Sequence, residues 1–138
     1  MPITDSSLLL QAIALVAYYR AWPVLIIVPA SMRLVWVEEC ERWLSFLLPD
    51  DVHVIFACSD KPGRDTPKVT IVSYQMLHRL RSDMLSRTFG MVIVDESHTI
   101  RPSRVPGKGD AAQTQTALRL IAAIPKAILL SGTPSPCR

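Results

Sequence analysis

Cysteine is scarce in this chain, and its scarcity narrows the chemistry open to the protein. The 138 residues include only Cys40, Cys58 and Cys137, an odd number of cysteines that lie far apart in the sequence. Such spacing suggests neither a disulfide framework nor the paired ligands of a zinc site. The sequence therefore favours a reducing compartment and a fold that is held together by its core.

The chain also lacks a segment of the kind that crosses a membrane or directs export. The apolar segment 8–19 is too short to span a bilayer. The polar start of the chain carries Asp5 but no Lys or Arg, unlike a signal peptide. No Lys/Arg-rich cluster of the nuclear-localisation type occurs. We therefore expect no membrane partner, and targeting signals do not reveal the compartment.

Charge of either sign is sparse. Charged residues make up 20% of the chain, and the formal net charge is +3 at pH 7. This weak positive balance permits a polyanionic partner without demanding one. The apolar fraction is 49%, and the length fits one globular domain with a real core but not two domains.

Apolar runs without polar alternation predict strands that are buried on both faces, and helical patterns separate them. Strands are expected at 24–28, 52–57, 69–73, 91–95 and 126–131. Helices are expected at 8–20, from a cap at Ser31 to Pro49, at 74–87 and at 111–124. This alternation predicts an α/β fold with a parallel sheet and helices on both faces. Ligands of such sheets lie beyond the carboxyl ends of the strands.

Several side chains of the predicted helices have plain structural interpretations. Trp36 and Trp43 are expected in the core or in an interface rather than as platforms for stacked bases. Arg79, Arg81 and Arg87 are expected to form a solvated helix face.

Two adjacent carboxylates, Asp95 and Glu96, follow the apolar run 91–94 at the expected carboxyl edge of the sheet. Burying an unpaired carboxylate is costly, so the placement needs a reason. In P-loop nucleoside triphosphatases an Asp in this setting holds Mg²⁺ on the phosphates, and a following Glu orients or deprotonates the attacking water. The alternative is a strand that simply ends in a polar loop.

The tetrad "DESH" (95–98), followed by "ILLSGTP" (128–134), resembles the nucleotide-binding lobe of superfamily-two helicase-like ATPases. The stretches 25–44 and 69–77 resemble segments of Swi/Snf-type ATPases. Their sequences are most similar to those of the HARP-type annealing helicases, which rewind DNA at stalled forks. The resemblance covers about residues 9–135. It implies a RecA-like three-layer domain with a mainly parallel sheet, a DNA partner, ATP and Mg²⁺ as ligands, and a nuclear location.

The resemblance also implies roles at the nucleotide site. Asp95 would hold Mg²⁺, partly through water, and Glu96 would activate the hydrolytic water. His98 would link this site to a coupling segment, although an ordinary loop histidine is the alternative. The coupling segment consists of Ser131, Gly132 and Thr133.

Two turns would face the nucleic-acid backbone if the resemblance holds. They contain Pro29, Ala30 and Ser31 in the first turn, and Ser73 and Tyr74 in the second. Backbone amides and hydroxyls at such turns suit phosphate contacts that ignore base sequence. For Ser73 and Tyr74 the alternative is a helix cap with a packed ring.

One element of the family pattern is absent, namely the G-x-x-x-x-G-K-S/T phosphate loop. Alignment on Gln11 places Leu8 and Leu9 where the Lys and Thr of that loop belong, and the segment 105–110 lacks the required spacing. The second lobe of the family is also absent after "SGTPS". We therefore expect a single partial ATP-binding lobe over 1–138, incomplete at its N-terminal strand and P-loop, that hydrolyses no ATP alone.

Two other functions stay open from the sequence. The chain could be a non-catalytic DNA- or protein-binding module that competes with a full-length relative. It could also be a metal-dependent hydrolase that uses Asp95, Glu96 and His98. In either case a missing strand would leave an uncovered apolar sheet edge, so self-association is expected.

Overall fold

The computed structural model describes residues 6–97 and 108–131. Its strands are β1 (Val24–Val28), β2 (Val52–Ile55), β3 (Val69–Ser73), β4 (Met91–Val94) and β5 (Lys126–Leu129). They form one sheet in the order β2-β3-β1-β4-β5, and every adjacent pair is parallel. The parallel sheet predicted from the apolar runs is therefore confirmed.

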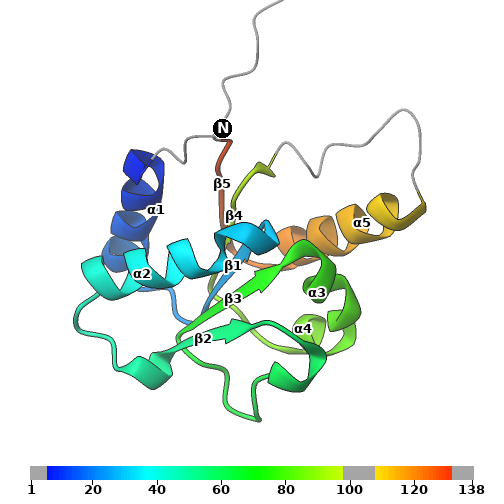
Figure 1. Cartoon of the computed structure of the whole chain (residues 1–138), viewed down its shortest axis with the longest axis horizontal. Helices are drawn as coiled ribbons and strands as arrows, with labels where there is room; N and C mark the ends of the chain where they lie inside the picture. The colour runs from blue at the N-terminus through cyan, green and yellow to red at the C-terminus, as the bar shows by residue number, and fades with distance from the viewer. Residues whose placement is uncertain (1–5, 98–107, 132–138) are drawn as a thin grey trace, which may run out of the picture.

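Helices cover both faces of this sheet, as Figure 1 shows. The helices α1 (Ser6–Tyr19) and α2 (Arg33–Trp43) pack on one face. The helices α3 (Tyr74–Arg79), α4 (Arg81–Ser86) and α5 (Lys108–Ala123) pack on the other. Short 3-10 turns are η1 (Ala30–Met32), η2 (Pro49–Asp51) and η3 (Cys58–Asp60). In the described part of the chain, no helix is both long enough and apolar enough to cross a membrane.

Strand β1 shows why the sequences of the strands are continuous apolar runs. Its residues Val24, Ile26 and Val28 join the core beneath α1 and α2. The alternate residues Leu25 and Ile27 join the core beneath α3, α4 and α5. Because successive side chains point to opposite faces, a strand that is covered on both sides must be apolar throughout.

Strand β5 is less covered than the other four. It lies at one edge of the sheet formed by the described strands, and Leu129 is 53% exposed. An apolar residue on an edge strand is a site where another chain can pair. The exposed Leu129 lies on an edge of the described sheet. That a missing strand leaves an edge uncovered, and that the chain self-associates, both stay predictions.

The single helix expected at 74–87 is two helices, α3 and α4. The break lies at Leu80, whose backbone has φ −102° and ψ 22°. The side chain of Arg81 donates to the carbonyl of His78 at 2.8 Å and so adds a side-chain bond to the end of α3. Arg79 and Arg81 are exposed, as expected.

The start of α2 also differs from the prediction. The cap expected at Ser31 is wrong, because Ser31 lies inside η1 and α2 begins at Arg33 without a side-chain cap. The amide of Met32 donates instead to the carbonyl of Pro29 at 2.9 Å. A 3-10 turn therefore satisfies the backbone where a capping hydroxyl was expected.

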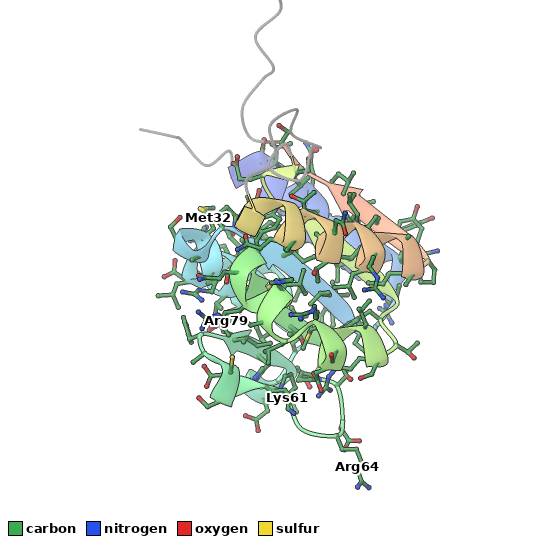
Figure 2. The ribbon with its side chains drawn as sticks, turned by 90° about the vertical axis from the view of Figure 1, so that its right-hand side faces the viewer. Met32, Lys61, Arg64 and Arg79 are labelled. Atoms are coloured by element: carbon green, nitrogen blue, oxygen red, sulfur yellow. The ribbon has the colours of Figure 1, made fainter. Side chains whose placement is uncertain are left out.

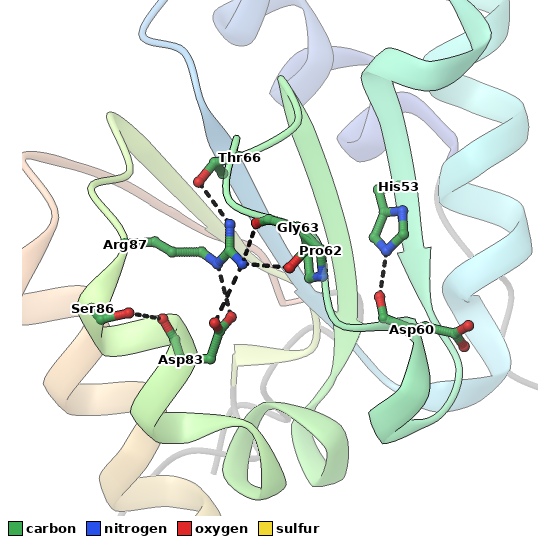
Figure 3. A network of polar contacts seen from close by, with 8 residues as sticks. All are labelled: His53, Asp60, Pro62, Gly63, Thr66, Asp83, Ser86 and Arg87. Carbon is green, nitrogen blue, oxygen red and sulfur yellow. Dashed lines mark hydrogen bonds and ion pairs between the residues drawn. The ribbon is translucent and has the colours of Figure 1, made fainter.

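Arg87 is not part of a solvated face, so that prediction is wrong. Its side chain is 9% exposed and forms an ion pair with Asp83, with 2.8 Å between Nε and Oδ2. The guanidinium also donates to Thr66 Oγ1 at 3.0 Å, to the Pro62 carbonyl at 2.6 Å and to the Gly63 carbonyl at 2.7 Å, as Figure 3 shows. Arg87 thereby fastens the loop between β2 and β3 to the end of α4.

Candidate functional site

The acid pair Asp95–Glu96 lies at the carboxyl edge of the sheet, directly after the end of β4, which lies between β1 and β5. The Asp95 amide donates to the Ile27 carbonyl at 2.8 Å, which extends the pairing of β4 with β1 by one residue. On the other side, the Ser97 amide donates to the Leu130 carbonyl at 2.7 Å. Backbone bonds to both neighbouring strands therefore fix the position of the pair.

Asp95 is only 5% exposed, and two N–H groups donate to its carboxylate. Its Oδ2 accepts the indole N–H of Trp36 at 2.9 Å, and its Oδ1 accepts the amide of Glu96 at 2.9 Å. No Lys or Arg in the described ranges, 6–97 and 108–131, pairs with this carboxylate. A buried carboxylate without a protein cation is a place where an added cation is favourable.

Glu96 has an unusual backbone conformation. Its φ is 56°, in the left-handed region that few residues other than glycine adopt. The conformation turns the chain so that the next amide, that of Ser97, reaches the carbonyl of Leu130. Holding a residue with a Cβ in this region costs about 1–2 kcal/mol.

This conformation gives a prediction. We expect Glu96→Gly to have a free energy of unfolding about 1 kcal/mol higher than that of Glu96→Ala, because glycine adopts positive φ without a Cβ penalty. Both changes remove the carboxylate, so their difference isolates the backbone effect. Urea denaturation followed by circular dichroism measures it, and an alanine variant as stable as the glycine variant would contradict the left-handed conformation.

The two turns expected to face DNA lie side by side, because Val28 and Ser73 are partners across β1 and β3. In the first turn Pro29 is half-buried and Ala30 and Ser31 are exposed. In the second turn the Ser73 hydroxyl is buried. It caps α3 by accepting the Met76 amide at 3.2 Å. The capping alternative therefore describes Ser73, while backbone contact with DNA at these turns stays a prediction.

Tyr74 points inward rather than toward solvent. Its hydroxyl donates to the carbonyl of Asp95 and lies 3.4 Å from the carbonyl of Glu96. Its ring is half-buried. The second turn thus contacts the acid pair directly, and a separation of 21 positions in the sequence gave no sign of this contact.

A cation and an aromatic ring to which the sequence assigned no role lie next to the first turn. The guanidinium of Arg33 donates to the Ala30 carbonyl at 3.1 Å and lies 4.9 Å from the ring centroid of Phe56, which is 49% exposed. In Figure 2, Met32, Arg79 and Lys61 follow one another from top to bottom of the view. Arg33 lies within the resembling stretch 25–44 but had no assigned role there, and Phe56 lies in no motif, so the sequence did not indicate that the two are neighbours.

The described residues offer limited means of holding a metal. No group of three or more His, Cys, Asp or Glu within them is placed to bind an ion. Burial, together with the charges of Glu39 and Glu41, raises the pKa of the Cys40 thiol to about 12, so this thiol stays neutral. Asp95 nevertheless fits Mg²⁺, which proteins often bind through one or two carboxylates while water and substrate phosphates supply the other oxygens.

Some predicted residues fall outside the described part of the chain. They are His98, Gly132 and Thr133. Ser131 is described, lies just after β5 and is exposed. Since Leu130 pairs with both Val94 and Ser97, Ser131 lies at the same sheet edge as the acid pair.

A family model described as the SNF2-related domain matches residues 7–136. The chain is 35% identical over 133 residues to the Xenopus tropicalis "SWI/SNF-related matrix-associated actin-dependent regulator of chromatin subfamily A-like protein 1", covering 94% of the chain and 13% of that protein. It is 37% identical over 131 residues to the human "DNA annealing helicase and endonuclease ZRANB3", covering 91% of the chain and 12% of that protein. The chain thus spans only a small part of the length of these relatives.

Two solved structures have a similar fold. The SWI2/SNF2 ATPase core of Sulfolobus solfataricus in complex with dsDNA matches with a TM-score of 0.67 and 18% identity, covering 97% of this chain and 26% of that chain. The UvsW helicase of bacteriophage T4 matches with a TM-score of 0.61 and 22% identity, covering 94% of this chain and 44% of that chain. At such identities the likeness concerns the fold, and it confirms the predicted RecA-like three-layer class.

Proposed function

Because the chain belongs to the SNF2-related domain family, we propose that it forms part of an ATP-binding lobe of a DNA translocase or annealing helicase. The Swi/Snf-type resemblance seen in the sequence is confirmed by this match and by relatives with more than 30% identity. The names of those relatives support work on chromatin or DNA, and a nuclear location would follow from such work.

The observation that carries the nucleotide half of the proposal is the buried Asp95 carboxylate at the carboxyl edge of the sheet. Asp95 would hold Mg²⁺, partly through water, since both carboxylate oxygens already accept an N–H group. Bound Mg²⁺ would neutralise charge on the ATP phosphates. Glu96, next in the chain, would accept a proton from the attacking water. Ser131, with His98, Gly132 and Thr133, would couple this site to DNA movement.

The chain alone is proposed to hydrolyse no ATP. The sequence lacks the phosphate-loop motif, whose glycine amides and Lys hold the phosphates and whose hydroxyl meets Mg²⁺. Loss of one charge-stabilising group at a phosphoryl-transfer site costs about a thousandfold or more in rate, so several losses abolish turnover.

A phosphate-release assay with Mg²⁺-ATP, with and without duplex DNA, tests this proposal. The expected result is the same background rate for the unchanged chain and for Glu96→Gln. DNA-stimulated release that disappears in Glu96→Gln would show that the lobe is active, which would contradict the proposed incapacity.

A second candidate function is a non-catalytic module that contacts DNA and competes with a full-length relative. Two features favour it, the partly exposed turn at 29–31 and the neighbouring Arg33. Contact between these residues and DNA would require no bound nucleotide. Fluorescence anisotropy with a labelled duplex, from 50 to 200 mM NaCl without nucleotide, measures it. Affinity should fall about tenfold for every two phosphates contacted. Absence of binding at 50 mM would remove this candidate.

A further inference from the structure

Trp36 makes an unusual contact for a core residue. Its side chain is fully buried, and its indole N–H donates to Oδ2 of Asp95 at 2.9 Å across 59 residues of sequence. Buried indole N–H groups need an acceptor, but a backbone carbonyl would serve equally well. Here the acceptor is the carboxylate assigned to Mg²⁺.

The acid pair is held by further hydrogen bonds. The Glu96 amide donates to Oδ1 of Asp95 at 2.9 Å. The Tyr74 hydroxyl donates to the Asp95 carbonyl. Trp36 therefore fixes one carboxylate oxygen, the Glu96 amide fixes the other, and Tyr74 fixes the peptide between the two acidic residues.

The two donors from other elements, Trp36 and Tyr74, each lie in a helix that begins at one of the two turns proposed to face DNA. Trp36 lies in the first turn of α2, directly after η1, and the nearby Arg33 binds back to the Ala30 carbonyl at 3.1 Å. Tyr74 is the first residue of α3 and follows Ser73. A displacement of either turn would thus move a group that is bonded to the acid pair.

We infer that Trp36 and Tyr74 are positioning residues that hold Asp95 and Glu96 in place and join them to the two turns. This inference rests on the proposed function for its meaning, since positioning matters only if the acid pair has a ligand. The hydrogen bonds themselves can be tested without any ligand. A failure of DNA or nucleotide binding is therefore distinguishable from a failure of the positioning role.

The test is amide hydrogen exchange of the ¹⁵N-labelled full chain, measured by NMR. Trp36→Phe keeps a ring in the core but removes the N–H donor. We expect the Glu96 amide to exchange at least tenfold faster in this variant, because its acceptor Asp95 is released. Amides of Ile26, in the neighbouring strand β1, and of Ile93, earlier in β4, should change less than twofold. Tyr74→Phe should accelerate the Glu96 amide in the same way.

Trp43→Phe is the matched control. Trp43 is on the same helix, but it is 48% exposed and its indole N–H donates to Glu39, four residues away. Its replacement should leave Glu96 exchange unchanged. The indole resonance provides a second readout: in Asp95→Asn the Trp36 N–H signal should move upfield while the Trp43 signal stays in place.

A double variant separates positioning from general packing. In the Asp95→Asn background the Trp36→Phe change should add less than twofold to Glu96 exchange, because the two residues act through one bond. Three results would overturn the inference. They are Glu96 exchange within twofold of the unchanged chain in Trp36→Phe, equal acceleration of all strand amides, and full additivity in the double variant.

Discussion

Gly90→Ala is expected to lower the free energy of unfolding by about 3 kcal/mol, through overpacking against rigid backbone. A Cβ at this position would lie 2.4 Å from the carbonyl oxygen of Ala21 and 2.8 Å from its carbonyl carbon. The chain cannot easily move away, since the Gly90 amide donates to the Pro23 carbonyl at 2.8 Å. Because Gly90 leads directly into β4, the damage should spread to the strand that carries the acid pair.

Gly63→Ala is the matched control for this effect. A Cβ at Gly63 would meet no atom within 4 Å, so its replacement should change the free energy of unfolding by less than about 0.5 kcal/mol. Urea denaturation of both variants gives the comparison. A Gly90→Ala variant as stable as Gly63→Ala would mean that the approach of Gly90 to Ala21 is not as described.

Arg87→Met should also destabilise the fold by about 3 kcal/mol. Methionine retains much of the apolar stem but leaves the Asp83 carboxylate, 21% exposed, without its cation. The carbonyls of Pro62 and Gly63 lose the donors that hold the loop. Thermal and urea unfolding measure the loss, and faster proteolysis within the loop 61–68 should accompany it.

Arg79→Met provides the control for Arg87. Arg79 is exposed on α3, and the same chemical change there should cost less than about 0.5 kcal/mol. Equal effects of the two substitutions would show that net charge, rather than the hydrogen-bond network of Arg87, sets the stability. Unchanged proteolysis of the loop in Arg87→Met would contradict its anchoring role.

The strands could be predicted from sequence because burial on both faces leaves a strong local signal. The run "VLIIV" is β1 residue for residue, and "VTIVS" is β3. The carboxyl-edge position of Asp95 and Glu96 followed from the end of such a run together with the parallel arrangement. These features depend on short segments, so the local sequence is sufficient to reveal them.

Features that depend on a distant partner could not be predicted in the same way. Trp36 was expected in the core, which is confirmed, but its bond to Asp95 depends on how α2 crosses the sheet. Arg87 was expected on a solvated helix face, and only the folded loop brings carbonyls to its guanidinium. The left-handed backbone of Glu96 likewise reflects the return of the chain toward β5 rather than any preference of glutamate.

The predictions of the helix boundaries were wrong for a related reason. Ser31 is a residue type that caps helices, but the preceding Pro29 carbonyl accepts the Met32 amide and a 3-10 turn forms first. At Leu80 the helical pattern of the sequence continues although the backbone does not. Competition between local hydrogen bonds decides such boundaries, and several solutions are compatible with one pattern.

The most direct test of the proposed DNA-facing edge is NMR mapping of the ¹⁵N-labelled chain during titration with a short DNA duplex at 50 mM NaCl. The expected result is that the largest amide shifts fall on Ala30, Ser31, Ser73 and Tyr74, with smaller shifts at Glu96 through the Trp36 and Tyr74 contacts. The shifts should diminish at 200 mM NaCl. Shifts confined to β5 or to the loop 61–68, or no shifts at the lower salt concentration, would contradict the assignment of this edge to DNA.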